Sequence, residues 1–319
     1  MDRGQGAGTG VCRRRLAWQR AGVRVAVLGL LLCGQVQPAQ AFDLLGAVED
    51  YYTQWIDMVH RTHEYEQPDW MTPLVTVIPT LQQEIRSDYF FTEAPHGLQT
   101  YSYLTKGTEI IPTENTEVIL GNPTYIERNK PAPEGVSGFG DWGWVFKYRI
   151  LASPSNADNY VLMFLLTGSA DTGQDKYISA NHNIYNPLLG FGKGWDWGWG
   201  EFDYQGTVGP VVPDGAIATL GTPVAWNSVF QYRLRIATPF LPNNPVSTLW
   251  PEFETTWFSY PNGAHPGQQQ LYLTVGAIAG RFALSEHGYF VLGLGYQFAV
   301  TQARLYNHQW LVTMRIPFF

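Results

Sequence analysis

The chain has 319 residues and a formal net charge of −7, and only 15% of its residues are charged. Residues 1–41 contain six of the 20 basic and one of the 27 acidic side chains, so the remainder carries a net charge of −12. That balance excludes a basic surface for nucleic acid. Both cysteines, Cys12 and Cys33, also lie in residues 1–41, so the remainder can form neither a disulfide nor a Cys-ligated metal site.

Residues 1–41 have the three parts of a secretory signal peptide. Five arginines between positions 13 and 24 precede an apolar stretch at 25–32, and Ala-Gln-Ala at 39–41 is a small-x-small cleavage motif. The apolar stretch is too short to span a membrane. We therefore expect export and cleavage near Ala41.

A short amphipathic helix is predicted over residues 44–61, and residues 42–81 are assigned to this helix and a lead-in segment. We interpret the helix as a lid on one end of the following domain, with a plug inside that domain as the alternative. The polar residues after the helix could bind a metal, but a solvated tail is the preferred interpretation, so no metal site is predicted. The apolar residues at helical spacing are Leu45, Val48, Tyr52, Trp55, Ile56 and Val59, and the polar residues are His60, His63, Glu64 and Glu66.

From about residue 82 the hydrophobic period becomes two, which indicates β-strands. In the last of them, Trp310 and Val312 alternate with Thr313 and Arg315. The strands are about 10–13 residues long, enough to cross a bilayer at a tilt, whereas ordinary strands average about 5–6. Twelve spans are predicted: 82–92, 99–111, 116–128, 142–152, 158–168, 183–193, 201–212, 224–238, 248–260, 270–283, 288–300 and 308–319.

These patterns predict an all-β fold: an antiparallel up-and-down transmembrane β-barrel over residues 82–319, with ten or fourteen strands as alternatives. Large apolar side chains would face lipid, with Trp and Tyr near the strand ends, and polar side chains would face the lumen. An even number of strands places both chain ends in the periplasm. Short turns are then expected at 113–115, 153–156 and 285–287, and longer outer loops at 129–140 and 168–182.

Four short motifs occur in an order and at a spacing typical of one protein family. They are Gly-Phe-Gly-Asp at 138–141 followed by Lys-Tyr-Arg at 147–149, Leu-Thr-Gly at 166–168, Gly-Trp-Gly-Glu-Phe-Asp at 198–203, and Arg-Ile-Pro-Phe at 315–318. From about residue 70 to 319 the chain thereby resembles the phenol-degradation (meta-pathway) family of outer-membrane barrels. The resemblance implies a transporter of aromatic or other apolar compounds, and it supplies no catalytic residues.

Seven charged residues fall on the predicted lumen face of their strands. As a charged constriction they would select permeants, and as a salt-bridged network they would close the lumen and hold the strands in register. Both interpretations remain open at this point. The candidate lumen-lining residues are Lys147, Arg149, Arg233, Arg235, Glu252, Glu254 and Arg315.

A register is predicted for the strands at 224–238 and 248–260, centred on Asn243-Asn244 in their connection. It places Arg235 opposite Glu252 and Arg233 opposite Glu254, with all four side chains in the lumen. Pairs of opposite charge across antiparallel strands contribute about 0.2–1 kcal/mol each.

Three tryptophans, Trp195, Trp197 and Trp199, stand at alternate positions among glycines. They could form a stacking platform for sugars or aromatic ligands. The interpretation we prefer is an interfacial anchor, because amphipathic rings settle at the level of the lipid headgroups.

The predicted function is passive passage of small, apolar or aromatic molecules across the outer membrane of a Gram-negative bacterium, without a cofactor. Expected partners are outer-membrane lipid, lipopolysaccharide and the barrel-assembly machinery, which would read the C-terminal strand. In that strand Phe318, rather than Phe319, shares the apolar phase. The alternatives are a closed structural barrel and, by fold analogy, a phospholipase or lipid A deacylase. For the enzyme, Ser285 and His287 come closest to a catalytic pair, but they fall in a predicted periplasmic turn.

Overall fold

The computed structural model describes the backbone of residues 38–130, 135–197, 200–235, 248–284 and 288–318, and the side chains in these ranges except at 38–45, 235 and 283. The chain forms two compact units that meet inside its first described helix, between Met58 and Val59. None of the helices in the described ranges is both long and apolar enough to cross a membrane.

The helix α2 (Pro38–Tyr65) is longer at both ends than the predicted span 44–61. Pro68 follows three residues after its end and disfavours helical backbone at the residue before it, which explains why the helix does not continue. Within the helix, the Thr53 hydroxyl donates a hydrogen bond to the carbonyl of Glu49 (2.9 Å).

All remaining regular structure is a single antiparallel sheet with short helical turns η1 (Pro95–Gly97) and α3 (Ile217–Leu220) in its connections. The strands are β1 (Glu84–Ala94), β2 (Leu98–Thr113), β3 (Thr116–Gly121), β4 (Tyr125–Arg128), β5 (Val136–Phe139), β6 (Trp142–Ser153), β7 (Tyr160–Ala170), β8 (Ile184–Trp197), β9 (Gly200–Pro210), β10 (Val212–Pro213), β11 (Val224–Arg235), β12 (Thr248–Ser259), β13 (Gln269–Ala283), β14 (Tyr289–Ala299) and β15 (His308–Pro317).

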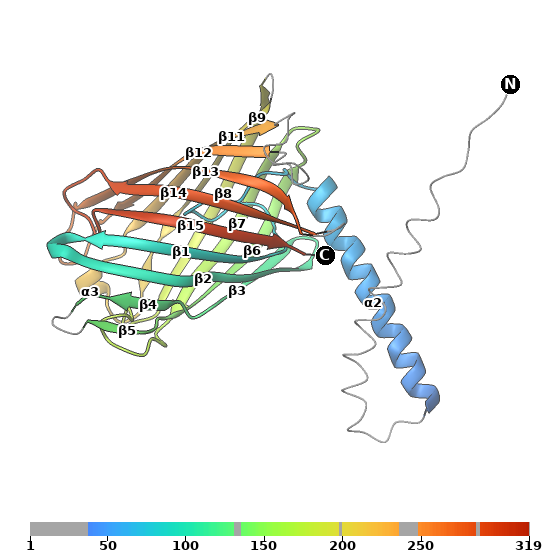
Figure 1. Cartoon of the computed structure of the whole chain (residues 1–319), viewed down its shortest axis with the longest axis horizontal. Helices are drawn as coiled ribbons and strands as arrows, with labels where there is room; N and C mark the ends of the chain where they lie inside the picture. The colour runs from blue at the N-terminus through green and yellow to red at the C-terminus, as the bar shows by residue number, and fades with distance from the viewer. Residues whose placement is uncertain (1–37, 131–134, 198–199, 236–247, 285–287, 319) are drawn as a thin grey trace. The chain divides into compact units, whose positions relative to one another are not determined.

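The sheet closes on itself. Each long strand pairs with the next along the chain, and β1 pairs both with β15 and with β2, which completes the ring. Apart from the short strands β4, β5 and β10, the ring has twelve strands, as predicted, and it appears as the wall of strands in Figure 1. The fold is a twelve-stranded antiparallel barrel preceded by a helix.

One of the predicted strands is interrupted in the structure, and one of the predicted loops contains a short strand. β3 ends at Gly121 and β4 begins at Tyr125, yet both pair with β2 in one register, since Gly107 faces Gly121 and Thr100 faces Arg128. The predicted strand 116–128 is therefore real but broken near Pro123, which has no N–H for the ladder. The predicted outer loop 129–140 contains β5, which pairs with β4 and lies beside it in Figure 1.

The predicted register between β11 and β12 is wrong by four residues. Glu252 lies opposite Gln231, and Arg235 lies opposite Thr248. The pairing therefore centres between positions 241 and 242, not on Asn243-Asn244. A shift by an even number keeps every side chain on its predicted face. A connection of twelve residues, 236–247, is too long to fix the register as a tight turn would.

Candidate functional site

The charged residues predicted to line the lumen lie on the buried face of the wall wherever their side chains are described. Lys147, Arg149, Glu252, Glu254 and Arg315 are buried, and Arg233 is 16% exposed. Their sequence neighbours point outward, since Tyr148, Ile150, Phe253 and Met314 are exposed. The backbone of Arg235 is described, but its side chain lies outside the described set.

The space inside the ring is occupied by residues 66–83, which we call the lumen segment. This irregular segment joins α2 to β1, and most of its residues are buried. It contacts inward-facing residues of strands on all sides of the ring, among them β1, β6, β9 and β12. A segment that touches the inner faces of opposite walls must lie inside the barrel.

Two arginines on adjacent strands bind carbonyl groups of the lumen segment. Arg315 on β15 donates to the carbonyls of Thr72 and Pro73, the latter at 2.9 Å from Nη2. Arg86 on β1 donates to the carbonyl of Leu74 at 2.7 Å. Arg86 also forms an ion pair with Asp88, with 2.8 Å between Nη2 and Oδ2.

Two glutamates on β12 bind the amide groups of the same stretch. Glu252 accepts a hydrogen bond from the N–H of Leu74, and Glu254 accepts from the N–H groups of Val75 and Thr76, all at 2.9 Å. Both carboxylates are buried. Residues 72–76 are therefore bound by a cationic part of the wall, on β1 and β15, and by an anionic part, on β12.

A second pair of charges holds the end of the lumen segment. Lys147 on β6 and Glu117 on β3 form a buried ion pair with 2.8 Å between Nζ and Oε1. Lys147 also donates to the carbonyl of Thr80 (3.1 Å), and Glu117 accepts from the N–H of Gln82 (2.5 Å). The same residues thus bind each other and the main chain.

Glycines in the wall make room for the larger side chains of the lumen segment. A Cβ atom added at Gly293 or Gly295 would lie 2.7 or 2.8 Å from the side chain of Leu74. Leu74 is fully buried there in a small apolar cluster that includes Trp250 of the wall. A Cβ at Gly192 would collide in the same way with the ring of Trp70.

Ion pairs also bind the start of the lumen segment, and they include Glu66, which was predicted to belong to a solvated tail, whereas Glu64 of that tail is exposed. Glu66 Oε2 lies 2.8 Å from Arg149 Nη2, and Asp69 Oδ2 lies 3.0 Å from Arg233 Nη1. Glu254, the partner predicted for Arg233, instead binds main chain. The described residues also contain no group of three His, Cys, Asp or Glu that could hold a metal ion.

Several charged residues of the inner wall were missed by the analysis of the sequence. The same period-two argument would have found them, because they stand at alternate positions on β1, β2, β3 and β9. They are Glu84, Arg86, Asp88, Glu109, Glu117, Glu201 and Asp203, and all of them are buried.

The tryptophans predicted as anchors lie on the outside of β8. Trp195 and Trp197 are 47% and 70% exposed, and Trp199 lies outside the described residues. Trp195 stacks on Phe202 of β9, with ring centroids 5.9 Å apart. These aromatic rings belong to the outer surface and do not contribute to the lumen.

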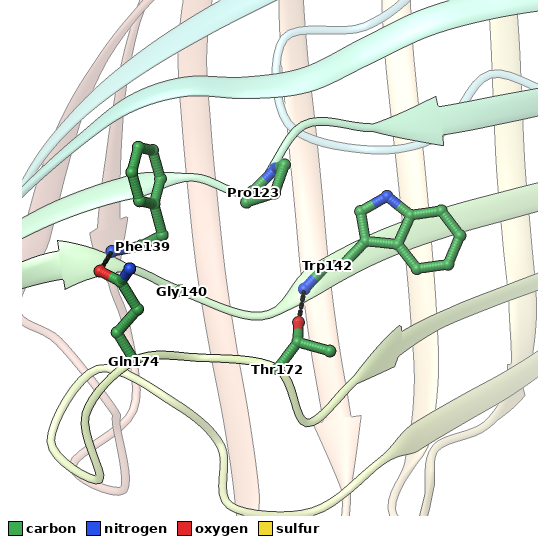
Figure 2. Close-up of a pocket in the computed structure, with 6 residues that line it drawn as sticks. All are labelled: Pro123, Phe139, Gly140, Trp142, Thr172 and Gln174. Atoms are coloured by element: carbon green, nitrogen blue, oxygen red, sulfur yellow. Dashed lines mark hydrogen bonds between the residues drawn. The ribbon is translucent and has the colours of Figure 1, made fainter.

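A hollow of about 430 Å³ lies where the strands are interrupted (Figure 2). Its polar contacts are internal to the loops: the Phe139 N–H donates to the Gln174 side chain, and the Trp142 N–H donates to the Thr172 hydroxyl, both at 2.9 Å. The lining residues are Pro123, Phe139, Gly140, Trp142, Thr172 and Gln174.

Asp141, beside this hollow, organises the loop 171–183. Its carboxylate accepts hydrogen bonds from the N–H groups of Thr172, Gly173 and Ala180 and from the Ser179 hydroxyl, at 2.7–3.1 Å. Partial burial alone would raise the pKa of Asp141, but these hydrogen bonds outweigh it and hold the pKa below its ordinary value.

Comparison with known proteins gives likeness of fold alone. No family model matches the chain, and no curated protein matches it, so the family suggested by its motifs remains a resemblance. A crystal structure of an outer-membrane channel from Pseudomonas putida F1 aligns with 13% identity over 78% of this chain and all of that one, with a TM-score of 0.48. The β domain of the Bordetella autotransporter BrkA aligns with 15% identity over 74% of this chain and all of that one, with a TM-score of 0.42.

Proposed function

We propose that this protein is an outer-membrane channel for passive passage of small molecules, and that the lumen segment is its gate. On this proposal the chain is exported by a signal peptide that ends near Ala41. The observation that supports a gate is the chemistry of its attachment. Arg86, Arg315, Glu252 and Glu254 hold it by hydrogen bonds to its main chain, and water can replace those bonds when the segment leaves.

A closed structural barrel would need no such attachment. An interior built only for stability is more simply filled with apolar side chains, because buried ions lose their hydration and often add no net stability. The paired charges of the inner wall therefore favour a lumen that is wet in at least one state of the protein.

The motif resemblance and the wall chemistry together suggest a class of permeant. The resemblance points to aromatic or other apolar compounds, whereas the wall around the lumen segment offers guanidinium, ammonium and carboxylate groups. Small aromatic compounds that carry hydroxyl or carboxylate groups fit both indications.

The test is to fix the gate in place. A Cβ atom at Gly190 would lie 3.0 Å from the Cβ of Pro79, so Pro79→Cys with Gly190→Cys should form a disulfide after a small adjustment. In a planar bilayer the oxidised protein should be silent, and reduction should restore openings. Each single cysteine variant is the matched control, and its conductance should not change when the reductant is added.

Silence of the reduced protein and of a variant lacking residues 42–81 would overturn the channel. In that case, release of fatty acid from outer-membrane lipid would indicate the enzyme, and its absence would indicate a closed structural barrel. Equal conductance in the oxidised and reduced states would leave a channel but remove the gate.

A further inference from the structure

The inner wall recognises the lumen segment mainly through its main chain. The carbonyls of Thr72, Pro73, Leu74 and Thr80 and the N–H groups of Leu74, Val75, Thr76 and Gln82 are all bound by charged side chains of the wall. Every non-proline residue carries these same groups. Recognition of this kind depends little on the sequence of the bound segment.

The wall places opposite charges where the main chain of the lumen segment presents its carbonyl and N–H groups. Arg86 and Arg315 lie on the adjacent strands β1 and β15, and Glu252 and Glu254 lie on β12, three strands away from β15 in the ring. The arginines donate hydrogen bonds to carbonyls of residues 72–76, and the glutamates accept hydrogen bonds from N–H groups of the same stretch. A peptide main chain offers both kinds of group along its length, and the bend at residues 74–76 turns them toward both parts of the wall at once.

Between residues 70 and 81, few side chains of the lumen segment are bound specifically by the wall. Leu74 enters the notch at Gly293 and Gly295, and Trp70 enters the notch at Gly192, where its ring N–H donates to Glu201 (3.1 Å). The stretch 70–81 contains no charged residue. The wall therefore fits an uncharged peptide that bends as residues 74–76 do, with an apolar side chain near its middle.

We propose that the inner wall is a binding site for peptides in an irregular, non-helical conformation, and that the lumen segment is its resident occupant. A peptide from outside the chain, uncharged over about seven residues, would enter the lumen when the resident segment leaves. This inference depends on the proposed function in one respect, namely that the segment can leave.

The test uses the full-length chain in two forms that share one wall. Leu74→Asp places a charge in the apolar notch and should displace the lumen segment, and the oxidised Pro79→Cys, Gly190→Cys protein keeps the segment in place. The probe is a fluorescent synthetic peptide with the sequence of residues 68–80, whose binding is followed by anisotropy. The peptide should bind the Leu74→Asp protein at least tenfold more tightly than the oxidised protein.

Two control peptides separate main-chain from side-chain recognition. Methylation of the amide nitrogens at the positions of Leu74, Val75 and Thr76 removes three donors and keeps every side chain, and it should weaken binding by more than tenfold. A peptide of the same composition, scrambled everywhere except at Asp69, Trp70 and Leu74, should bind within about threefold. In the wall, Glu254→Gln should weaken binding about tenfold, as expected for the loss of one charge-assisted hydrogen bond.

The outcomes distinguish this inference from the channel. Openings of the Leu74→Asp protein without peptide binding, or equal binding of the methylated peptide, would overturn the peptide site and leave the channel intact. Binding only of the native sequence would show a dedicated gate and also overturn the inference. If Leu74→Asp fails to insert, the variant lacking residues 42–81 takes its place once its folded band on a gel shows that it forms a barrel.

Discussion

The Asp141 carboxylate shows how a single residue ties an outer loop to the barrel wall. Its hydrogen bonds reach Thr172, Gly173, Ser179 and Ala180 of the loop 171–183. Asp141 is part of the Gly-Phe-Gly-Asp motif that supports the family resemblance. Its chemistry here is the positioning of a loop.

The first prediction is that Asp141→Ala loosens the loop 171–183. Four hydrogen-bond donors lose a charged acceptor, so trypsin should cut after Lys176 about tenfold faster or more in folded protein at neutral pH. Asp158 lies in a turn at the other end of the barrel, so the Asp158→Ala variant should be cut after Lys176 at the wild-type rate. Equal rates for Asp141→Ala and wild type would show that other contacts hold the loop.

The pH dependence of this loop follows from the same contact. Because the pKa of Asp141 is lowered by folding, its contribution to stability is complete above the ordinary value of 3.8 and is lost as the pH falls through the lower, folded value. The amide chemical shifts of Thr172, Gly173 and Ala180 should titrate together below pH 3.8. A midpoint above 3.8 would contradict the effect of the hydrogen bonds.

A second prediction at the residue scale concerns the glycine notch. Gly295→Val should push Leu74 out, because the nearest atoms to an added Cβ belong to the side chains of Leu74 and Leu311, at 2.8 and 3.2 Å. Overpacking costs about 1–3 kcal/mol, so the open probability of the channel should rise. Gly143→Ala is the control, since the nearest atom to its added methyl group is 3.8 Å away.

The pair Gly295→Val and Leu74→Ala should be less than additive. Leu74→Ala alone removes a buried side chain, at a cost of about 2–5 kcal/mol, and in the double variant the valine occupies part of the vacated space. A double-mutant cycle on open probability measures this coupling. Strict additivity would mean that the two side chains do not share the notch.

At the scale of elements, the period of two was enough to place the strands but not to set the register between β11 and β12. Alternation predicted which faces of β11, β12 and β15 point inward. A charged side chain turned from the lumen toward lipid costs about 2–4 kcal/mol, so charges mark the inner face. The register of β11 against β12 depends on a connection of twelve residues, and no local rule fixes its centre. The break near Pro123 follows from the N–H group that proline lacks, and alternation of apolar and polar residues does not record it.

The lumen segment was missed for a related reason. Residues 66–83 show no period because they form neither helix nor strand, so they looked like a polar lead-in. Their order comes from partners such as Glu252 and Arg315, which are more than 170 positions away in the chain. The charges of the wall were predictable, and their use as anchors for main chain was not.

The third prediction tests the register of β11 and β12 on their outer faces. Phe230 lies directly opposite Phe253, so Phe230→Cys with Phe253→Cys should form a disulfide under mild oxidation. Phe230→Cys with Trp257→Cys, which the predicted register would pair, should not. Those positions are displaced by four residues, about 13 Å along the strand. Both native cysteines precede residue 41, so they do not compete with the introduced pairs after cleavage of the signal peptide. A cross-link of the second pair instead of the first would support the register expected from sequence.

At the scale of the whole molecule, the final prediction separates closure of the barrel from filling of its lumen. The ring closes through β1, which pairs with β15 on one side and β2 on the other, and neither ladder involves the lumen segment. Without that segment, the two opposite charges within each of the buried ion pairs Arg86–Asp88 and Lys147–Glu117 still neutralise each other. A variant lacking residues 42–81 should therefore still insert and still run anomalously on a detergent gel until it is boiled. Its melting temperature should fall, because the buried contacts of Trp70 and Leu74 are lost.

Removal of residues 308–319 should have the opposite effect. It leaves β1 and β14 as unpaired edges, and an open sheet cannot satisfy its backbone in lipid. This variant should give no heat-modifiable band at any temperature, although its lumen segment is intact. If the variant lacking residues 42–81 also gives none, the lumen segment is a core on which the barrel folds, and a removable gate at this position is excluded.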